Sequence, residues 1–295
     1  MRDATDFEQL SLPDGRRLGW TTFGDPGGRP VLAFHGTPAC RLLFSPADDV
    51  ARRLGLCVIA PDRPGFGVSD PQPGRTLADW SRDTSHLMDH LRIGRAPVVA
   101  ISGGGPYAVG VAAHLSERIS GLALVSPLGE IGAPSDKVHL SRAERGFFLG
   151  LPKVPRLLRR GARMTRAAFL AAPEVSFSMF AATLSSADRR VFSVPATRRA
   201  MIAMTREAVR QGVDAPLADM AIFSKPWGLD LGAIRTPAVL WQGTADKVVP
   251  AAFTFDFADR LGDCRVHELE GQGHFWVFEH IEEVMRAVAD LPFRE

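Results

Sequence analysis

Short apolar segments rich in β-branched residues recur along the chain and alternate with segments of helical periodicity. Nearly continuous apolar strands that alternate with helices are typical of a parallel sheet covered by helices on both faces. A Pro-Asp-Gly turn at residues 13–15 separates two earlier segments and predicts a hairpin over residues 7–24. The apolar segments after it span residues 30–34, 57–60, 97–101, 119–125, 237–241 and 265–269. Their order predicts an α/β fold built on a mostly parallel sheet.

The alternation stops between about residues 129 and 230, where helical patterns continue without a convincing strand. Segments such as "KVPRLLRRGARMTRAAFLAA" and "VPATRRAMIAMTREAVRQG" place apolar residues at helical spacing with basic residues between them. A helical block inserted into a parallel sheet is expected to lie over the strand ends. We therefore predict a core formed by residues 1–128 and 231–295, with a helical cap inserted at 129–230.

The composition is that of a globular protein, with 295 residues of which 45% are hydrophobic. The first ten residues are polar and acidic, and no segment approaches the roughly 20 apolar residues that span a membrane. We therefore expect a cytoplasmic protein with no membrane span. The three cysteines, Cys40, Cys57 and Cys264, lie far apart and form no C-x-x-C motif, so neither a disulfide framework nor a zinc site is expected.

The net charge of +2 conceals an uneven distribution. Residues 131–230 contain 16 Lys and Arg against 8 Asp and Glu, a net charge of +8, so the rest of the chain carries −6. The basic segment is either a solvated surface or a positive rim that attracts anionic substrates, an acidic partner or a membrane surface. Nucleic acid is not an expected partner, because the acidic remainder would oppose a duplex and no aromatic stacking platform accompanies the arginines.

The stretch "AISGGGPYA", residues 100–108, joins a predicted strand to a predicted helix. Small residues, Ala100 and Gly104, stand two positions on either side of Ser102. This spacing resembles the G-x-S-x-G nucleophile elbow, with alanine in place of the first glycine. Such an elbow holds a serine on a strained turn and presents its hydroxyl above the sheet.

The same stretch also fits a dinucleotide-binding fingerprint, with Gly103, Gly105 and Ala108 at the G-x-G-x-x-G/A positions. Two features count against this alternative. Pro106 offers no N–H to a pyrophosphate, and the preceding strand is the third parallel strand, whereas the fingerprint belongs to the first. The stretch alone leaves both readings open.

Another strand ends at "FHGTP", residues 34–38. Its glycine gives a flexible backbone at the sheet edge, where the N–H groups of Thr37 and Gly103 could together hold an oxyanion. His35 precedes the serine and lies within the turn, so we interpret it as a residue that orients the loop rather than as a base.

Two further candidates follow later strands. Asp246, in "WQGTADKVVP", comes after the strand at 237–241, and His274, in "LEGQGHFWVF", lies between the last strand and the last helix. An aspartate at such a loop suits a carboxylate that accepts a hydrogen bond from an imidazole. The alternative carboxylate is Glu130 in "SPLGE", at the start of the predicted cap. Ser102, Asp246 and His274 follow one another in the chain order Ser, Asp, His, which differs from the orders found in the serine proteases.

With these motifs in this order, the chain resembles a capped, esterase-like member of the α/β-hydrolase superfamily. The resemblance covers nearly the whole chain, and "PDRPGFGVSD" is similar to the loop that the family carries after its fourth strand. The predicted cap matches only in being helical. The resemblance implies that Ser102 is the nucleophile, His274 the base and Asp246 the acid, that the amides of Thr37 and Gly103 form the oxyanion hole, and that no metal or organic cofactor takes part.

The function that the resemblance implies is hydrolysis of a carboxylic ester of a small to medium, largely apolar substrate through an acyl-enzyme. The alternatives are other chemistries of the same fold: an aminopeptidase or amidase, a C–C bond hydrolase, a lactonase and a cofactor-free perhydrolase. A ligand receptor without catalysis is a further alternative. Serine at the elbow argues against the dehalogenase and epoxide-hydrolase branches, which use aspartate there. The substrate-binding residues and the oligomeric state stay unassigned.

Overall fold

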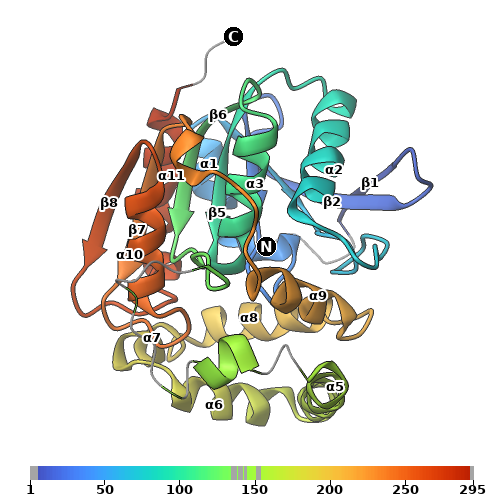
Figure 1. The fold of residues 1–295 in the computed structure, drawn as a ribbon, viewed down its shortest axis with the longest axis vertical. Helices are drawn as coiled ribbons and strands as arrows, with labels where there is room; N and C mark the ends of the chain where they lie inside the picture. The colour runs from blue at the N-terminus through green and yellow to red at the C-terminus, as the bar shows by residue number, and fades with distance from the viewer. Residues whose placement is uncertain (1–5, 134–137, 139–141, 143–144, 151–153, 293–295) are drawn as a thin grey trace.

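A single eight-stranded sheet forms the centre of the computed structural model, which describes residues 6–133, 138, 142, 145–150 and 154–292. The strand order is β1-β2-β4-β3-β5-β6-β7-β8 (Figure 1). β1 pairs antiparallel with β2, and β2 with β4, whereas every other neighbouring pair is parallel. The predicted hairpin and mostly parallel sheet are confirmed. The strands are β1 (Glu8–Ser11), β2 (Arg17–Gly24), β3 (Arg29–Phe34), β4 (Leu56–Pro61), β5 (Ala96–Ile101), β6 (Ile119–Val125), β7 (Ala238–Gly243) and β8 (Cys264–Leu269).

Helices cover both faces of the sheet, as the nearly continuous apolar strands predict. Successive strand residues point to opposite faces, so Leu32 and Phe34 pack in one apolar cluster while Val31 and Ala33 pack in the other. The first cluster includes residues of α2 (Leu77–His90), α3 (Gly105–His114) and α10 (Ala251–Arg260). The second includes residues of α1 (Asp48–Arg53) and α11 (Val277–Asp290). Every residue of the central strands β5 and β6 is buried, whereas the edge strand β8 is partly exposed.

Between β6 and β7, the described residues form helices and no strand. The helices are a short π-helical segment (Arg145–Gly150), α5 (Pro155–Ala171), α6 (Pro173–Thr183), α7 (Ser186–Val191), α8 (Pro195–Ala208), α9 (Asp214–Phe223) and a 3₁₀ turn (Leu231–Ala233). Figure 1 shows α5 to α9 gathered on one side of the sheet, and we call them the helical insertion. No helix in the described ranges combines the length and the apolar character needed to cross a membrane.

The helical insertion packs against the core through apolar side chains. Phe169, Phe177, Met201 and Met204 are buried in the same cluster as α1 and α11. In α/β sheets, functional side chains gather at the carboxyl ends of the parallel strands. Here that edge carries the loops after β3, β5, β7 and β8, where the sequence places its candidate residues.

Candidate active site

Ser102 directly follows β5 and begins a short 3₁₀ turn, Ser102–Gly104, that leads into α3. Its backbone φ is +56°, in the left-handed region that residues with a side chain rarely adopt. The side chain is partly exposed although its neighbours in the turn are buried. A strained, partly exposed serine on a strand-to-helix turn is the geometry of a nucleophile elbow.

The glycines after Ser102 allow close approach of neighbouring backbone. A Cβ atom on Gly104 would lie 2.3 Å from the carbonyl oxygen of Phe34, at the end of β3. A Cβ atom on Gly103 would lie 2.8 Å from Thr37 Oγ1. These contacts give the glycines a packing function that needs no bound dinucleotide. Pro106 stands in the first turn of α3, where it removes an amide that a phosphate would use.

His274 and Asp246 form a buried pair. His274 Nδ1 lies 2.7 Å from Asp246 Oδ2, and the two side chains are 4% and 0% exposed. Burial alone would lower the pKa of His274, but attraction and hydrogen bonding to Asp246 outweigh it and raise that pKa. Burial alone would raise the pKa of Asp246, but the interactions with His274 and two backbone amides lower it. The pair therefore favours an ionised carboxylate beside a ring that readily accepts a proton.

The rest of the Asp246 carboxylate is also held. Oδ1 accepts hydrogen bonds from the amides of Val248 (2.7 Å) and Val249 (2.9 Å), and Oδ2 accepts one from Gln242 Nε2 (3.1 Å). Both oxygens are thus fixed by the loop after β7. The hydrogen bond to His274 is therefore made by a carboxylate with a defined orientation.

The alternative carboxylate, Glu130, is engaged elsewhere. Its oxygens accept hydrogen bonds from the amide of Trp227 (2.6 Å) and from the Arg260 guanidinium (2.5 Å). These contacts join the two ends of the segment between β6 and β7 to α10. Glu130 forms no hydrogen bond with a histidine among the described residues.

The loop after β6 links Ser102 with His274. Ser126 Oγ donates a hydrogen bond to the carbonyl oxygen of His274 (3.4 Å), and the amide of Leu128 donates one to the carbonyl oxygen of Ser102 (3.1 Å). The hydrogen bonds of the described residues include none between the side chains of Ser102 and His274. Such bonds are often long in a free enzyme and shorten when substrate binds.

The loop after β3 packs directly against the serine. A Cβ atom on Gly36 would lie 3.2 Å from Ser102 Cβ. Because a Cβ atom on Gly103 would also contact the Thr37 side chain, the segments Gly36–Thr37 and Ser102–Gly103 lie side by side. The structure thus brings together the two segments that carry the amides predicted to form an oxyanion hole.

A buried ionic network supports this loop. Asp219 of α9 is fully buried and pairs with Arg63 (2.9 Å) and Arg75 (2.5 Å), while accepting hydrogen bonds from the hydroxyls of Thr37 (2.5 Å) and Tyr107 (2.5 Å). Burial alone would raise the pKa of Asp219, but the two guanidinium groups lower it well below its ordinary value. The helical insertion is therefore fastened to the loop that faces Ser102.

His35 helps to fix the same loop. Its Nδ1 lies 2.8 Å from the carbonyl oxygen of Gly36, and its Nε2 accepts a hydrogen bond from the amide of Arg63 (3.1 Å). The Arg63 guanidinium also donates to the carbonyl oxygens of both His35 and Gly36. Burial, together with the Arg63 charge, lowers the pKa of His35, which keeps the ring neutral. These contacts agree with the loop-orienting interpretation.

A second acidic residue of the helical insertion contacts the histidine loop. Asp188 of α7 is fully buried, and its oxygens accept hydrogen bonds from the amides of His274 (3.2 Å) and Phe275 (2.7 Å). A Cβ atom on Gly273 would lie 2.2 Å from this carboxylate, so glycine is needed for the approach. The negative charge of Asp188 also contributes to the raised pKa of His274.

Sequence reasoning missed the roles of Asp188 and Asp219. A third acidic residue of the insertion, Glu207, likewise pairs with the fully buried Arg41 of the core (2.9 Å). The available signal was charge: the acids are few in the segment 131–230, so each of them invited a search for a buried cation or amide. No group of three or more His, Cys, Asp or Glu side chains in the described ranges could hold a metal ion.

Residues 31–289 match the sequence profile of the family described as "Alpha/beta hydrolase family". The chain belongs to this family. It is 36% identical over 114 residues to an uncharacterized hydrolase, YcgS, from Bacillus subtilis, a match that spans 38% of this chain and 39% of that protein. It is 26% identical over 275 residues to 2-hydroxymuconate semialdehyde hydrolase from Pseudomonas putida, spanning 92% and 90% of the two chains.

Solved structures of other hydrolases have the same fold. A hydrolase from Pseudomonas aeruginosa PA01 superposes with a TM-score of 0.73 at 20% identity, covering 97% of this chain and 99% of the other. The esterase EaEST from Exiguobacterium antarcticum gives a TM-score of 0.73 at 17% identity, covering 96% and 98%. The predicted α/β-hydrolase sheet is thereby confirmed.

Proposed function

We propose that this alpha/beta hydrolase is a serine esterase that cleaves carboxylic esters through an acyl-enzyme. The observation that carries the proposal is the convergence, at one edge of the sheet, of Ser102 in a strained turn and the buried His274–Asp246 pair. Ser102 is the nucleophile, His274 the general base and Asp246 the residue that orients and stabilises the histidine. This constellation, recognised by geometry and roles, performs acyl transfer on several unrelated folds.

The hydrogen bonds of His274 determine the direction of proton transfer. Because Nδ1 donates to Asp246, the other ring nitrogen, Nε2, is left to take the proton of Ser102 as Oγ attacks the ester carbonyl. His274 then gives this proton to the departing alcohol, which leaves an acyl group on Ser102. In the second half-reaction it takes a proton from water, and the acid is released.

The negative charge that develops on the carbonyl oxygen needs donors already in place. We assign this role to the backbone amides of Thr37 and Gly103. The buried contacts of Asp219 and Arg63 support the assignment, because they fix the Gly36–Thr37 loop before substrate arrives. Donors that need no reorganisation stabilise a transition state more than mobile ones.

The surroundings favour an uncharged, largely apolar substrate of small to medium size. Phe223 of α9 lies against Gly103, and the Phe275 ring packs edge-on against the His274 ring with centroids 5.0 Å apart. The guanidinium groups of Arg63 and Arg75 are buried and held by Asp219, so they support the loop rather than face a substrate. We further propose that residues 129–230 act as a cap over the core formed by 1–128 and 231–295.

A C–C bond hydrolase is the second candidate. It is favoured by the 26% identity, over 92% of this chain, to 2-hydroxymuconate semialdehyde hydrolase. C–C bond hydrolysis also releases a carboxylic acid, so Ser102, His274 and Asp246 could catalyse it as well. We rank C–C hydrolysis second because such a substrate carries acidic groups. The described residues around Ser102 and His274 are aromatic, and the nearby Arg63 and Arg75 already pair with Asp219.

The experiment is a substrate panel measured with one enzyme preparation. It compares p-nitrophenyl esters of rising acyl length, aliphatic lactones, aminoacyl amides and a vinylogous diketone that reports C–C cleavage. The proposal predicts the highest kcat/KM for short and medium esters, with loss of all activities in Ser102→Ala. A higher kcat/KM for the diketone would transfer the assignment to C–C hydrolysis, and a serine-independent activity would contradict the mechanism.

A further inference from the structure

An apolar stripe runs along the solvent-facing side of α5. It begins at the N-cap residue Val154 and continues through Leu157, Gly161, Met164 and Ala168, all of which are exposed. Their spacing alternates between three and four residues, which places them on one side of a helix. Leu157 and Met164 are 65% and 66% exposed. The exposed apolar residues of α5 therefore lie in one line along the helix.

The opposite side of α5 is fixed to the rest of the insertion. Phe169 is buried in the apolar cluster shared with α1 and α11, and Leu158 is partly buried. Arg166 donates hydrogen bonds to the carbonyl oxygens of Val209 (2.8 Å) and Arg210 (3.2 Å), which lie at and just beyond the end of α8. One side of α5 thus packs against the protein, and the exposed stripe forms a second apolar side that faces solvent.

The neighbouring helix α6 extends this surface. It follows α5 directly and contributes Val175 and Met179, one helical turn apart and 61% and 69% exposed. Most of the large exposed apolar side chains in the described chain lie between residues 154 and 180: Val154, Leu157, Met164, Val175, Met179 and Phe180. We call the first five the α5–α6 face; the Phe180 ring packs against Phe177 and Phe275 instead. A gathered apolar surface of this kind marks a binding surface.

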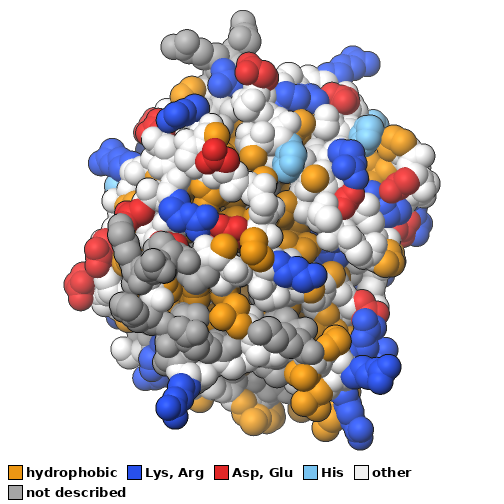
Figure 2. All heavy atoms as spheres, in the orientation of Figure 1, with side chains coloured by type: hydrophobic (Ala, Val, Ile, Leu, Met, Phe, Trp, Pro, Cys, Tyr) orange, Lys and Arg blue, Asp and Glu red, His pale blue; other side chains and the backbone are white. Residues whose placement is uncertain are grey.

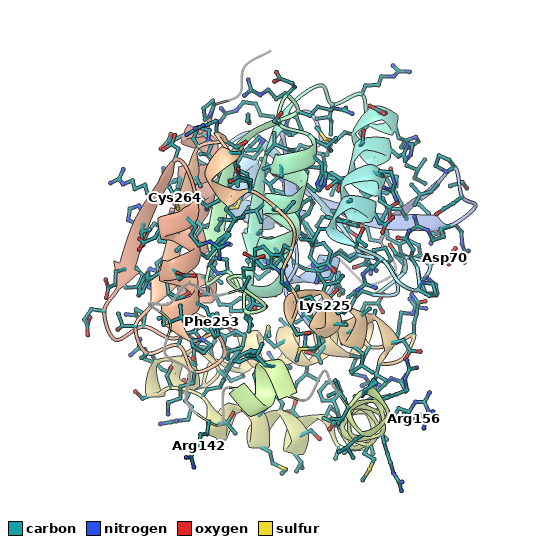
Figure 3. The ribbon with its side chains drawn as sticks, in the orientation of Figure 1. Asp70, Arg142, Arg156, Lys225, Phe253 and Cys264 are labelled. Carbon is teal, nitrogen blue, oxygen red and sulfur yellow. The ribbon has the colours of Figure 1, made fainter. Side chains whose placement is uncertain are left out.

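Positive charge borders the α5–α6 face. Helix α5 contains five arginines and no acidic residue. Arg156, Arg160 and Arg163 are exposed along the flank next to the stripe, and no ion pair of theirs is found within the described ranges. Figure 2 shows basic and apolar side chains meeting at the lower right of the molecule, where Figure 1 places α5, and Figure 3 shows Arg156 on its outer side.

The combination of charges and apolar side chains selects the occupant. A second copy of this chain docked through the same face would bring Arg156, Arg160 and Arg163 against their own copies. The exposed acids beside the face, Asp214 and Glu174, already pair with Arg159 and Arg198. An anionic lipid surface supplies both complements, since its phosphates pair with guanidinium groups and its acyl chains accept the apolar side chains. We propose that the α5–α6 face docks onto the surface of an anionic bilayer, with α5 lying in the plane of the interface.

The test is co-sedimentation of the full chain with vesicles. One set contains phosphatidylcholine alone, and the other contains about one phosphatidylglycerol in three lipids, enough to give a negative surface potential. We expect binding to the anionic vesicles only, and loss of that binding at 1 M salt, where the screening length is about 3 Å. An arginine near such a surface contributes about a fivefold gain in partitioning, so Arg156→Glu with Arg160→Glu should weaken binding by at least about 25-fold.

Two further variants separate the contributions. Leu157→Ser with Met164→Ser removes the centre of the stripe and should also abolish binding while leaving the charge unchanged. The matched control is Arg265→Glu with Val266→Ser, a basic and an apolar residue exposed on the edge strand β8, which should bind like the unmodified protein. Thermal melting confirms that each variant is folded.

Several outcomes overturn the proposal. They are failure to bind anionic vesicles, equal binding to both vesicle types, and unchanged binding in either α5 variant. Light scattering without lipid tests whether a second copy of the chain binds the face instead. The face would be assigned to a second copy if the protein does not bind vesicles but forms a concentration-dependent dimer, and if Leu157→Ser with Met164→Ser makes that dimer dissociate. Because the readout is sedimentation, the result is independent of the proposed esterase activity.

Discussion

Replacing Asp188 with asparagine probes the link between the helical insertion and the histidine loop. The carboxylate accepts the amide hydrogens of both His274 and Phe275, whereas an asparagine side chain of the same shape has only one acceptor oxygen. Its NH₂ group would face the second amide. One charge-assisted hydrogen bond is lost and one buried N–H group is left without a partner, which together cost about 2–4 kcal/mol. At roughly 2–3 °C per kcal/mol, Tm should fall by about 4–12 °C.

The same substitution should change catalysis in a recognisable way. The negative charge of Asp188 helps to raise the pKa of His274, so Asp188→Asn should lower that pKa. The acidic limb of the kcat/KM profile then moves to lower pH, an effect that a purely structural residue would not produce. Looser positioning of the ring should also reduce kcat.

The assays are differential scanning calorimetry and kcat/KM measured against pH. Asp214→Asn provides the matched control, because Asp214 is an aspartate of the insertion whose side chain is 69% exposed and pairs with a surface arginine. It should change stability by less than about 0.5 kcal/mol. A Tm unchanged in Asp188→Asn, with a pH profile that superimposes on that of the unmodified enzyme, would refute the reasoning.

Three further predictions concern the carboxylates and the histidine. Asp246→Asn should lower kcat by about 10⁴-fold, as in the protease triad, while Glu130→Gln retains activity in the same steady-state assay; the reverse result would identify Glu130 as the acid. His274 must be neutral to accept a proton, and its pKa is raised above the ordinary value of 6.5. The value of kcat/KM should therefore rise with pH and reach half its maximum above pH 6.5. A profile that is already flat below pH 6 would contradict this. The pKa of Asp219 is lowered in the fold, so its ionised carboxylate stabilises the protein at pH values above the ordinary pKa of 3.8. This stabilisation is lost as the pH falls from 3.8 toward the folded-state pKa. The difference in unfolding free energy between the unmodified protein and Asp219→Asn, measured with urea, should therefore shrink below about pH 4, and a constant difference would show that the carboxyl is not preferentially ionised in the fold.

The sheet and the candidate residues could be predicted from the sequence because their signals are local. Apolar strands, the Pro-Asp-Gly turn and the small residues around Ser102 each lie within one short segment. Asp246 and His274 could be found because both follow a strand end, and parallel strands bring their carboxyl ends to one edge. The pairing of His274 with Asp246 rather than Glu130 required the structure, which shows the hydrogen bond.

The contacts of the helical insertion could not be predicted in the same way. Asp188 lies 86 residues before His274, and Asp219 lies 182 residues after Thr37, so no local pattern records either contact. Helical periodicity located α5 but could not tell which side faces the core. Leu158 and Phe169 suggest one apolar side and Leu157 and Met164 another, and only tertiary packing distinguishes the two.

The central claim is that Ser102 is the attacking group, and a fluorophosphonate tests it most directly. Such a probe forms a stable bond with a serine only where a base activates the hydroxyl and an oxyanion site accepts the phosphoryl oxygen. Mass spectrometry of the digested, labelled protein should find one adduct, on Ser102, formed in step with the loss of ester hydrolysis and absent from His274→Ala. An adduct on another serine, or an unlabelled Ser102 in folded, ester-cleaving protein, would contradict the account.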